Sequence, residues 1–378
     1  MFESIIVYSF LAIIMILSGF YTASVPPMRK DQGYYVSYII PIIAFTFVFG
    51  CRYDVGIDYL HYLQMYEIGT DKESEPLFRY FTEYMSSQGY HFAFYFSLWA
   101  CIQISLIYYA LRNHRYLFPY MAFFLIFGMF FMSMMNVIRQ QLAACVFMVA
   151  ISFIADKKLV KYLLCVLIAS IFHRSAILLL VVYPVLAWKN DWFKARGLQL
   201  LLYFAAIIVS IRFADQFIAL LEEPFALFTG MTDYEDSYHF TTLGKEKDSI
   251  ARFGNNSGFG LYTNIILTVP IILLSNKMRE FYNSPYFNIV YFLFFISIIA
   301  GHLFGSSIIL NRPFVYVINF RFVMYAFFSY YCVKKKEGIN QLLLLGFVLI
   351  HFAIFLNQIT NGVVNKSRFL FFWDVYSL

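Results

Sequence analysis

The chain has 378 residues, of which 61% are hydrophobic and only 13% are charged, and its formal net charge is +6. Soluble domains are about 45–50% apolar and about 25% charged, so this composition excludes an ordinary water-soluble protein. The five cysteines fall mostly inside apolar stretches and predict neither a disulfide framework nor a metal cluster.

Apolar stretches follow one another along the whole chain, and a membrane-spanning helix needs roughly 20 such residues. About twelve stretches qualify, which predicts an all-α, polytopic membrane protein with a single transmembrane domain over residues 1–378. The first stretch lacks a basic leader and a small-residue cleavage site, so we interpret it as a retained helix. The predicted spans are Ser4–Tyr21, Tyr35–Gly50, His91–Leu111, Leu117–Met134, Val137–Ala155, Lys161–Phe172, Ala176–Trp188, Leu198–Ile218, Phe259–Ser275, Tyr286–Phe304, Asn319–Val333 and Gln341–Gln358.

Basic residues recur in alternate loops, as the positive-inside rule predicts for the cytoplasmic side. The remaining loops are then extracytoplasmic, including residues 51–90 and 219–258 and the turn at His173. Within residues 51–90, Pro76 is suited to begin a helix, which would lie amphipathically on the outer surface. The predicted inside loops carry Arg29, Lys30, Arg112, Arg115, Lys157, Lys158, Lys161, Lys189, Lys194, Arg196, Lys277, Arg279, Lys334, Lys335 and Lys336.

Arginine outnumbers lysine in the predicted outside loops, although topology requires only positive charge. A guanidinium is planar and bidentate, so it recognises phosphate or carboxylate, and these arginines indicate a phosphorylated substrate. The alternative is that they pair with outside acids as structural bridges. The arginines at a similar predicted outer depth are Arg52, Arg139, Arg174, Arg252, Arg312 and Arg321.

The densest polar segment directly follows the second predicted span. Arg52, Asp54 and Asp58 surround Gly56, which allows a tight turn. A carboxylate here is a candidate general base. If a helix resumes, Asp58 and Tyr62 share one face. The alternative is a membrane-exit loop with an internal salt bridge.

Two further segments carry candidate residues. Arg139 and Gln140 open the fifth predicted span, where the positive end of the helix disfavours a cation unless an anion offsets it. A snorkelling arginine is the alternative. His173 and Arg174 lie between two short predicted helices, a position that commonly builds sites in membrane proteins. The alternative for His173 is a turn-capping histidine. Glu75, just before Pro76, is a weaker candidate for a chemical role.

The second half offers fewer candidates. Arg252 lies in the long outer loop, and Arg312 and Arg321 flank the start of the eleventh predicted span, where Arg321 and Tyr325 are four residues apart. We find no Walker loop, dinucleotide fingerprint, metal-binding His pair or serine nucleophile elbow.

These residues together resemble the EpsG family of polysaccharide biosynthesis proteins, relatives of the Wzy-type O-antigen and capsule polymerases. The resemblance covers most of the chain. It depends on Arg52, Asp54, Gly56, Asp58, Tyr59, Tyr62, Glu75, Ile138-Arg139-Gln140, His173-x-Ser175, and Arg321 with Tyr325.

The resemblance implies a membrane-embedded glycosyltransferase of the C class in the bacterial cytoplasmic membrane. It would polymerise oligosaccharide repeat units linked to undecaprenyl diphosphate, on the extracytoplasmic face. The arginines, with Gln140, Tyr59, Tyr62, Glu75 and Tyr325, would bind this substrate, and the candidate bases are Asp58, Asp54 and His173, in that order. Membrane lipids and a chain-length regulator are the other expected partners; no cofactor, metal or nucleic acid is expected.

Two other functions remain open at this stage. An O-acyltransferase or O-antigen ligase is the nearest enzymatic alternative, and it would want a His or Asp near a central or cytoplasmic cavity. A lipid-linked oligosaccharide flippase or transporter would carry cations along a path that both faces reach, or acids within its spans.

Overall fold

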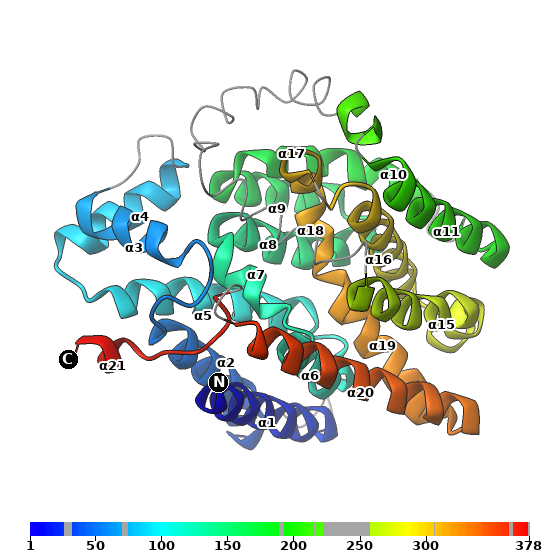
Figure 1. Ribbon diagram of the computed structural model, residues 1–378, viewed down its shortest axis with the longest axis horizontal. Coiled ribbons are helices and arrows are strands. Elements are labelled where there is room, and N and C mark those ends of the chain that lie inside the picture. Colours follow the sequence, from blue (N-terminus) through cyan, green and yellow to red (C-terminus); the bar gives the residue numbers. More distant parts are fainter. Residues whose placement is uncertain are drawn as a thin grey trace. The chain divides into compact units, whose positions relative to one another are not determined.

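A computed structural model describes residues 1–25, 32–69, 75–188, 193–214, 216–221, 258–305, 307–362 and 366–376. Within these ranges the regular structure is helical, apart from an isolated antiparallel bridge between Arg52 and Phe371 (Figure 1). The chain divides into two compact units, of which unit 1 is Met1–Trp188 with Phe322–Leu378 and unit 2 is Lys189–Arg321. A single transmembrane domain stays a prediction.

Unit 1 is built on long apolar helices packed in sequence. The N-terminal helix α1 packs against α2 and α6, α2 packs against α5, α5 against α8, and α8 against α9. Its elements are α1 (Phe2–Ser24), α2 (Gln32–Gly50), α3 (Tyr59–Ile68), α4 (Pro76–Ser87), α5 (Phe92–Ala110), η1 (Arg115–Leu117), α6 (Phe118–Phe127), α7 (Phe131–Asn136), α8 (Ile138–Ala155), α9 (Leu159–Phe172), η2 (Arg174–Val181), α10 (Val182–Trp188), most of α19 (Phe320–Lys335), α20 (Gly338–Thr360) and α21 (Phe372–Tyr376).

Unit 2 packs its first helix against two others. Helix α11 (Arg196–Arg212) contacts α15 (Gly258–Tyr282) and α16 (Pro285–Leu303). Arg279 fixes one end, because its guanidinium donates to Oδ1 of Asn288 at 2.9 Å and to the carbonyl of Phe193 at 3.2 Å. The remaining elements are α17 (Ile308–Asn311), η3 (Arg312–Phe314), α18 (Val315–Ile318) and the start of α19.

The prediction of an all-α membrane protein is confirmed, but the predicted number of about twelve spans is not supported. Among the described residues, 7 helices are long and apolar enough to cross a membrane. The other predicted spans form helices of 17 residues or fewer within the described residues. The long spans are Phe2–Ser24, Gly33–Gly50, Phe92–Ala110, Ile138–Ala155, Gly258–Tyr282, Pro285–Leu303 and Gly338–Thr360.

The predicted span Leu117–Met134 shows why the count differs. Helix α6 ends at Phe127, and Met129 adopts a left-handed backbone (φ 58°) before α7 begins at Phe131. The side chains on either side of the break remain buried. Sequence hydropathy reports the apolar character of these side chains but not the break in the backbone. Two short helices therefore look like one span in the sequence.

One end of unit 1 gathers residues that the sequence assigned to the cytoplasmic side. Arg115 donates to the carbonyl of Thr22, at the end of α1, at 3.4 Å, and it lies 5.1 Å from the ring of Tyr34, near the start of α2. The ring of Tyr116 lies 4.4 Å from that of Tyr330 in α19. These contacts agree with the predicted grouping of the basic loops, whereas the side of the membrane stays a prediction.

Candidate functional site

Glu75 is the centre of a charged cluster in unit 1. Pro76 begins α4, and the carboxylate of Glu75, just before it, reaches two other elements. Arg139, in the first turn of α8, donates from Nη1 to Oε2 at 2.6 Å. His173, between α9 and η2, lies with Nδ1 2.7 Å from Oε1, and the backbone N–H of Arg174 is 3.4 Å from the same oxygen. We call Glu75, Arg139, His173 and Arg174 the Glu75 cluster.

Electrostatics keep Glu75 ionised. Its side chain is only 6% exposed. Burial alone raises the pKa of this carboxyl, but the hydrogen bond with His173 and the charge of Arg139 outweigh burial and lower the pKa to about 2. A permanent carboxylate can only accept hydrogen bonds, so Nδ1 of His173 carries the proton between them. Nε2 is therefore the imidazole nitrogen left for other chemistry.

The anion that offsets Arg139 is an internal one. The sequence predicts an anion near this cation at the start of α8, and Glu75 fills that place. Arg139 also hydrogen-bonds the hydroxyl of Tyr62 and lies 5.7 Å from the ring of Phe78. Glu75, which the sequence ranked as weak, is thus the residue that gathers the other members. A role of Arg139 in substrate binding stays a prediction.

Tyr62 connects the Glu75 cluster to the segment after α2. The expected helix does resume, because α3 begins at Tyr59 and the backbone N–H of Tyr62 donates to the carbonyl of Asp58 at 3.1 Å. Asp58 is half-buried at the start of this helix, and Tyr62 is buried. Burial raises the pKa of Tyr62, so its hydroxyl stays protonated.

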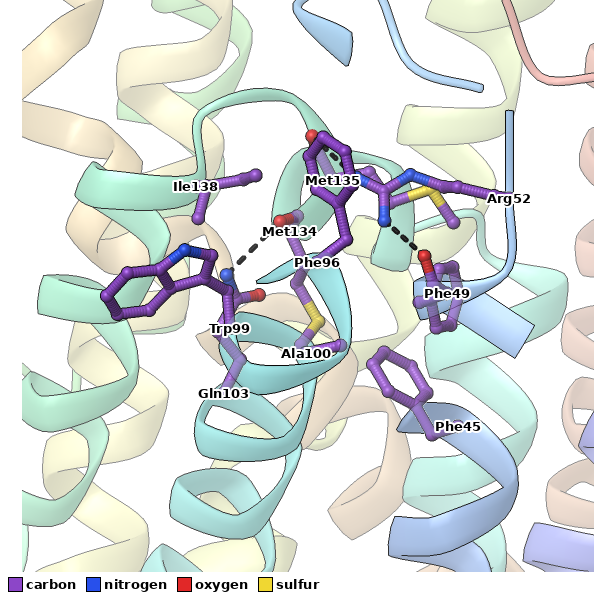
Figure 2. A pocket seen from close by; sticks show the side chains of 10 residues that line it. All are labelled: Phe45, Phe49, Arg52, Phe96, Trp99, Ala100, Gln103, Met134, Met135 and Ile138. Atoms are coloured by element: carbon purple, nitrogen blue, oxygen red, sulfur yellow. Dashed lines mark hydrogen bonds between the residues drawn. The ribbon is translucent and has the colours of Figure 1, made fainter. Parts of the chain in front are cut away.

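Arg52 is buried among backbone carbonyls (Figure 2). Its guanidinium donates to the carbonyls of Phe49, Val55 and Met135, and it lies 4.8 Å from the ring of Phe96. Burial lowers the pKa of Arg52 to about 10, still far above neutrality. The adjoining cavity has room for about one water molecule. Arg52 therefore links α2, the following loop and α7, and no described acid pairs with it.

Asp54 and Gly56 are also held within the protein. The carboxylate of Asp54 pairs with Nζ of Lys366 at 2.5 Å, so its partner is a distant lysine and not a residue of the same loop. Gly56 has φ 100°, and a Cβ there would lie 2.6 Å from Oδ1 of Asn136. The same oxygen accepts from the N–H of Ile57 at 2.6 Å.

Comparison with known families identifies the chain at this point. Residues 35–371, nearly its whole length, match the model of the EpsG family. The chain belongs to the EpsG family. It is a membrane protein of polysaccharide biosynthesis, as the family and the apolar helices together establish. Comparisons with curated proteins and with solved structures found no match.

Three other predicted site residues of this EpsG-family protein are buried in helices of unit 1. Gln140 is buried in α8, Tyr59 is buried with its ring 4.7 Å from that of Phe96, and Tyr325 is buried in α19. Their roles in substrate binding stay predictions.

Unit 2 holds two of the predicted arginines. Arg321 donates from Nε to Oγ of Ser297 at 3.1 Å and from Nη2 to the carbonyl of the same residue, which ties it to α16. Arg312 is half-buried in η3. Arg252 and most of the predicted loop 219–258 lie outside the described residues. Binding of a diphosphate by these arginines stays a prediction.

Sequence reasoning about this EpsG-family protein missed Lys366 and underestimated α4. Lys366 follows the last predicted span by only a few residues, and a lone lysine there gives no sign of a partner 312 positions earlier. In α4, which the sequence predicted to lie on the outer surface, Phe78 is fully buried against Trp99, at 5.0 Å between ring centroids, whereas Phe81 and Tyr84 are exposed. The described residues contain no group of three or more His, Cys, Asp or Glu arranged as metal ligands.

Proposed function

We propose that this protein is a glycosyltransferase that joins undecaprenyl-diphosphate-linked oligosaccharide repeat units into surface polysaccharide, on the outer face of the cytoplasmic membrane. The observation that carries the proposal is the pairing of Glu75 with His173, beside Arg139 and an exposed Arg174, in a chain of the EpsG family. Such a cluster combines a candidate base with cations for an anionic leaving group.

The reaction needs a base for the acceptor. A sugar hydroxyl on one lipid-linked repeat unit attacks the anomeric carbon of the other, the hydroxyl proton passes to the base, and the bond from that carbon to the diphosphate oxygen breaks. We assign His173 as the base. Glu75 accepts a hydrogen bond from Nδ1–H, which leaves the lone pair on Nε2, and its charge stabilises the imidazolium as the acceptor's proton arrives.

The geometry favours His173 over the two aspartates that the sequence ranked first. Asp54 is neutralised by Lys366 at 2.5 Å. Asp58 lies at the start of α3, beside Tyr62. His173, in contrast, is a neutral base candidate held by an ionised carboxylate, and that arrangement is typical of general bases.

The leaving diphosphate needs cations, and Arg174 is the first candidate. Its side chain is exposed, and its guanidinium makes no hydrogen bond or ion pair with a described residue. Arg139 is already bound to Glu75 and Tyr62. We therefore assign Arg174 to the diphosphate, where a bidentate guanidinium stabilises the developing charge, and Arg139 to holding Glu75 in place.

Reconstitution tests the proposed function. The purified protein in liposomes receives undecaprenyl-diphosphate-linked repeat units, and the products are resolved by length. We expect a ladder of lengthened lipid-linked glycans and released undecaprenyl diphosphate. Arg174→Ala should weaken use of the donor more than use of the acceptor, whereas Arg79→Ala, on the exposed face of α4, serves as the matched control.

Three results would contradict the proposal. Transfer of an acyl group to the glycan would show an acyltransferase, and transfer of finished glycan to a different lipid would show a ligase. Movement of lipid-linked units across the bilayer without any new glycosidic bond would show a flippase.

A further inference from the structure

A segment near the C-terminus runs alongside the loop that follows α2. We call residues Lys366–Phe372 the strap and residues Cys51–Asp58 the Arg52 loop. Figure 1 shows the red strap beside the blue end of α2, and Arg52 and Phe371 form an antiparallel bridge. The backbone hydrogen bonds run from Tyr53 N to Leu370 O at 2.8 Å, from Gly56 N to Lys366 O at 2.8 Å, and from Phe372 N to Cys51 O at 3.0 Å.

One ion pair also joins these two segments. Nζ of Lys366 lies 2.5 Å from Oδ2 of Asp54, and both residues have a left-handed backbone with φ 49°. Such a conformation is unfavourable for residues other than glycine, so the contacts around both residues must maintain it. The two side chains are 41% and 30% exposed. An exposed pair contributes little to stability, so its main effect is on the shape of the loop.

The strap is itself anchored to long helices. The hydroxyl of Tyr8, in α1, donates to the carbonyl of Ser367 at 3.1 Å, and the N–H of Phe369 donates to Oγ of Ser4 at 2.9 Å. The ring of Phe372 lies 5.6 Å from that of Phe92, at the start of α5. The strap is therefore a fixed support for the Arg52 loop.

The Arg52 loop in turn leads to the Glu75 cluster. The side chain of Asn136 accepts the N–H of Ile57 at 2.6 Å, and Asn136 is the last residue of α7, just before α8 with Arg139 in its first turn. At its far end the loop passes into α3, whose Tyr62 bonds Arg139. A change in the loop would therefore displace Asp58 and Tyr62 relative to the Glu75 cluster.

We propose that Lys366 is a positioning residue for the glycosyl transfer. It holds the Arg52 loop, and through it Asp58 and Tyr62, against the Glu75 cluster, where His173 takes the proton of the acceptor. This inference rests on the proposed function. The inference goes beyond the proposed function because it assigns a role to a part of the chain far from the Glu75 cluster in sequence. Lys366 touches no reacting atom in this role.

The test compares three variants of the full-length protein in lipid nanodiscs. Lys366→Met removes the ion pair, and Lys366→Arg retains it. Arg368→Met removes an exposed cation of the strap whose guanidinium donates to the carbonyl of Thr360 at 3.2 Å. Hydrogen exchange follows the amides of Tyr53 and Gly56, and kinetics with lipid-linked repeat units separate KM for the acceptor from kcat.

We expect Lys366→Met to speed exchange at both amides at least tenfold and to raise KM for the acceptor at least tenfold, with the melting temperature nearly unchanged. Lys366→Arg should restore both values, and Arg368→Met should change neither. Unchanged exchange, or faster exchange with an unchanged KM, would overturn the positioning role. If the wild-type protein forms no polymer, the proposed function fails, and the exchange data still decide whether Lys366 holds the loop.

Discussion

The two ends of unit 1 use charged residues in different ways. At the end that holds the Glu75 cluster, one carboxylate, 6% exposed, binds two side chains from two other elements. At the end of α8 away from this cluster, Asp156 and Lys158 form a single pair in which both side chains are about half exposed. The first arrangement orders a buried site, whereas the second is a solvated surface pair.

This difference has an energetic consequence. Removing one partner of a buried charge network leaves the other charge without compensation, which typically costs about 3–5 kcal/mol. Removing one partner of an exposed pair typically costs about 0–1 kcal/mol. Variants at the two ends should therefore separate clearly in stability and in activity.

The largest effect is expected for Glu75→Gln. It leaves Arg139 without its anion and His173 without its acceptor, so we expect a loss of about 3–5 kcal/mol of stability and about 10²–10⁴-fold in polymerisation rate. Thermal unfolding in detergent and the reconstituted assay measure the two losses. Glu83→Gln on the same helix breaks an exposed pair with Arg79 at 3.9 Å and is the control. Equal losses of stability and rate in the two variants would show that Glu75 does not organise the site.

The second-largest effect is expected in the pH dependence of stability, which should differ between the wild type and Glu75→Gln. The pKa of Glu75 is lowered in the folded protein to about 2 from 4.5, so its contribution is fully present above about pH 4.5 and is lost as the pH falls towards 2. The shift corresponds to about 3 kcal/mol. Unfolding of the wild type and of Glu75→Gln between pH 7 and pH 3 should therefore converge at low pH. A constant difference over this range would contradict the lowered pKa.

A smaller loss is expected for Gly56→Ala. The left-handed backbone costs about 1–2 kcal/mol with a Cβ, and the Cβ would also meet Oδ1 of Asn136 at 2.6 Å. Gly89→Ala is a matched control, because φ is 69° there and no atom lies within 4 Å of the added Cβ. The difference between the two melting temperatures isolates the contact with Asn136. If Gly56→Ala is no worse than Gly89→Ala, that contact does not support the Arg52 loop.

The smallest effect is expected for Lys158→Ala, at the opposite end of α8. It should change stability by less than about 1 kcal/mol and leave the polymerisation rate unchanged, provided that the protein still inserts normally. Membrane levels and the reconstituted assay check both. A loss as large as that of Glu75→Gln would show that the two ends are equivalent.

The sequence predicted part of the fold because helix signals are local. Pro76 marks the start of α4, and the apolar stretch from Val137 to Ala155 corresponds closely to α8. It did not predict the break between α6 and α7, because the apolar residues on both sides are buried. Hydropathy reports how apolar the side chains are and says little about the local direction of the backbone.

The sequence singled out the residues of the Glu75 cluster as candidates but did not predict which of them pair with one another. Arg139 and His173 were recognised from their places at helix ends, and an anion near Arg139 was expected from the helix dipole. That this anion is Glu75, and that Lys366 pairs with Asp54, depends on contacts between residues far apart in the chain. A single sequence carries no signal of such pairs.

The rate of glycosidic bond formation by His173→Gln tests the central claim, that His173 is the base oriented by Glu75. The assay uses purified protein and undecaprenyl-diphosphate-linked repeat units, with His61→Gln, an exposed histidine on α3, as the control. We expect the rate of His173→Gln to be about 10²–10⁴-fold below that of the wild type, with the lipid diphosphate still bound. The rate of His61→Gln should match the wild type. A His173→Gln variant that polymerises at the wild-type rate, or an Asp58→Asn variant that alone loses activity, would contradict it.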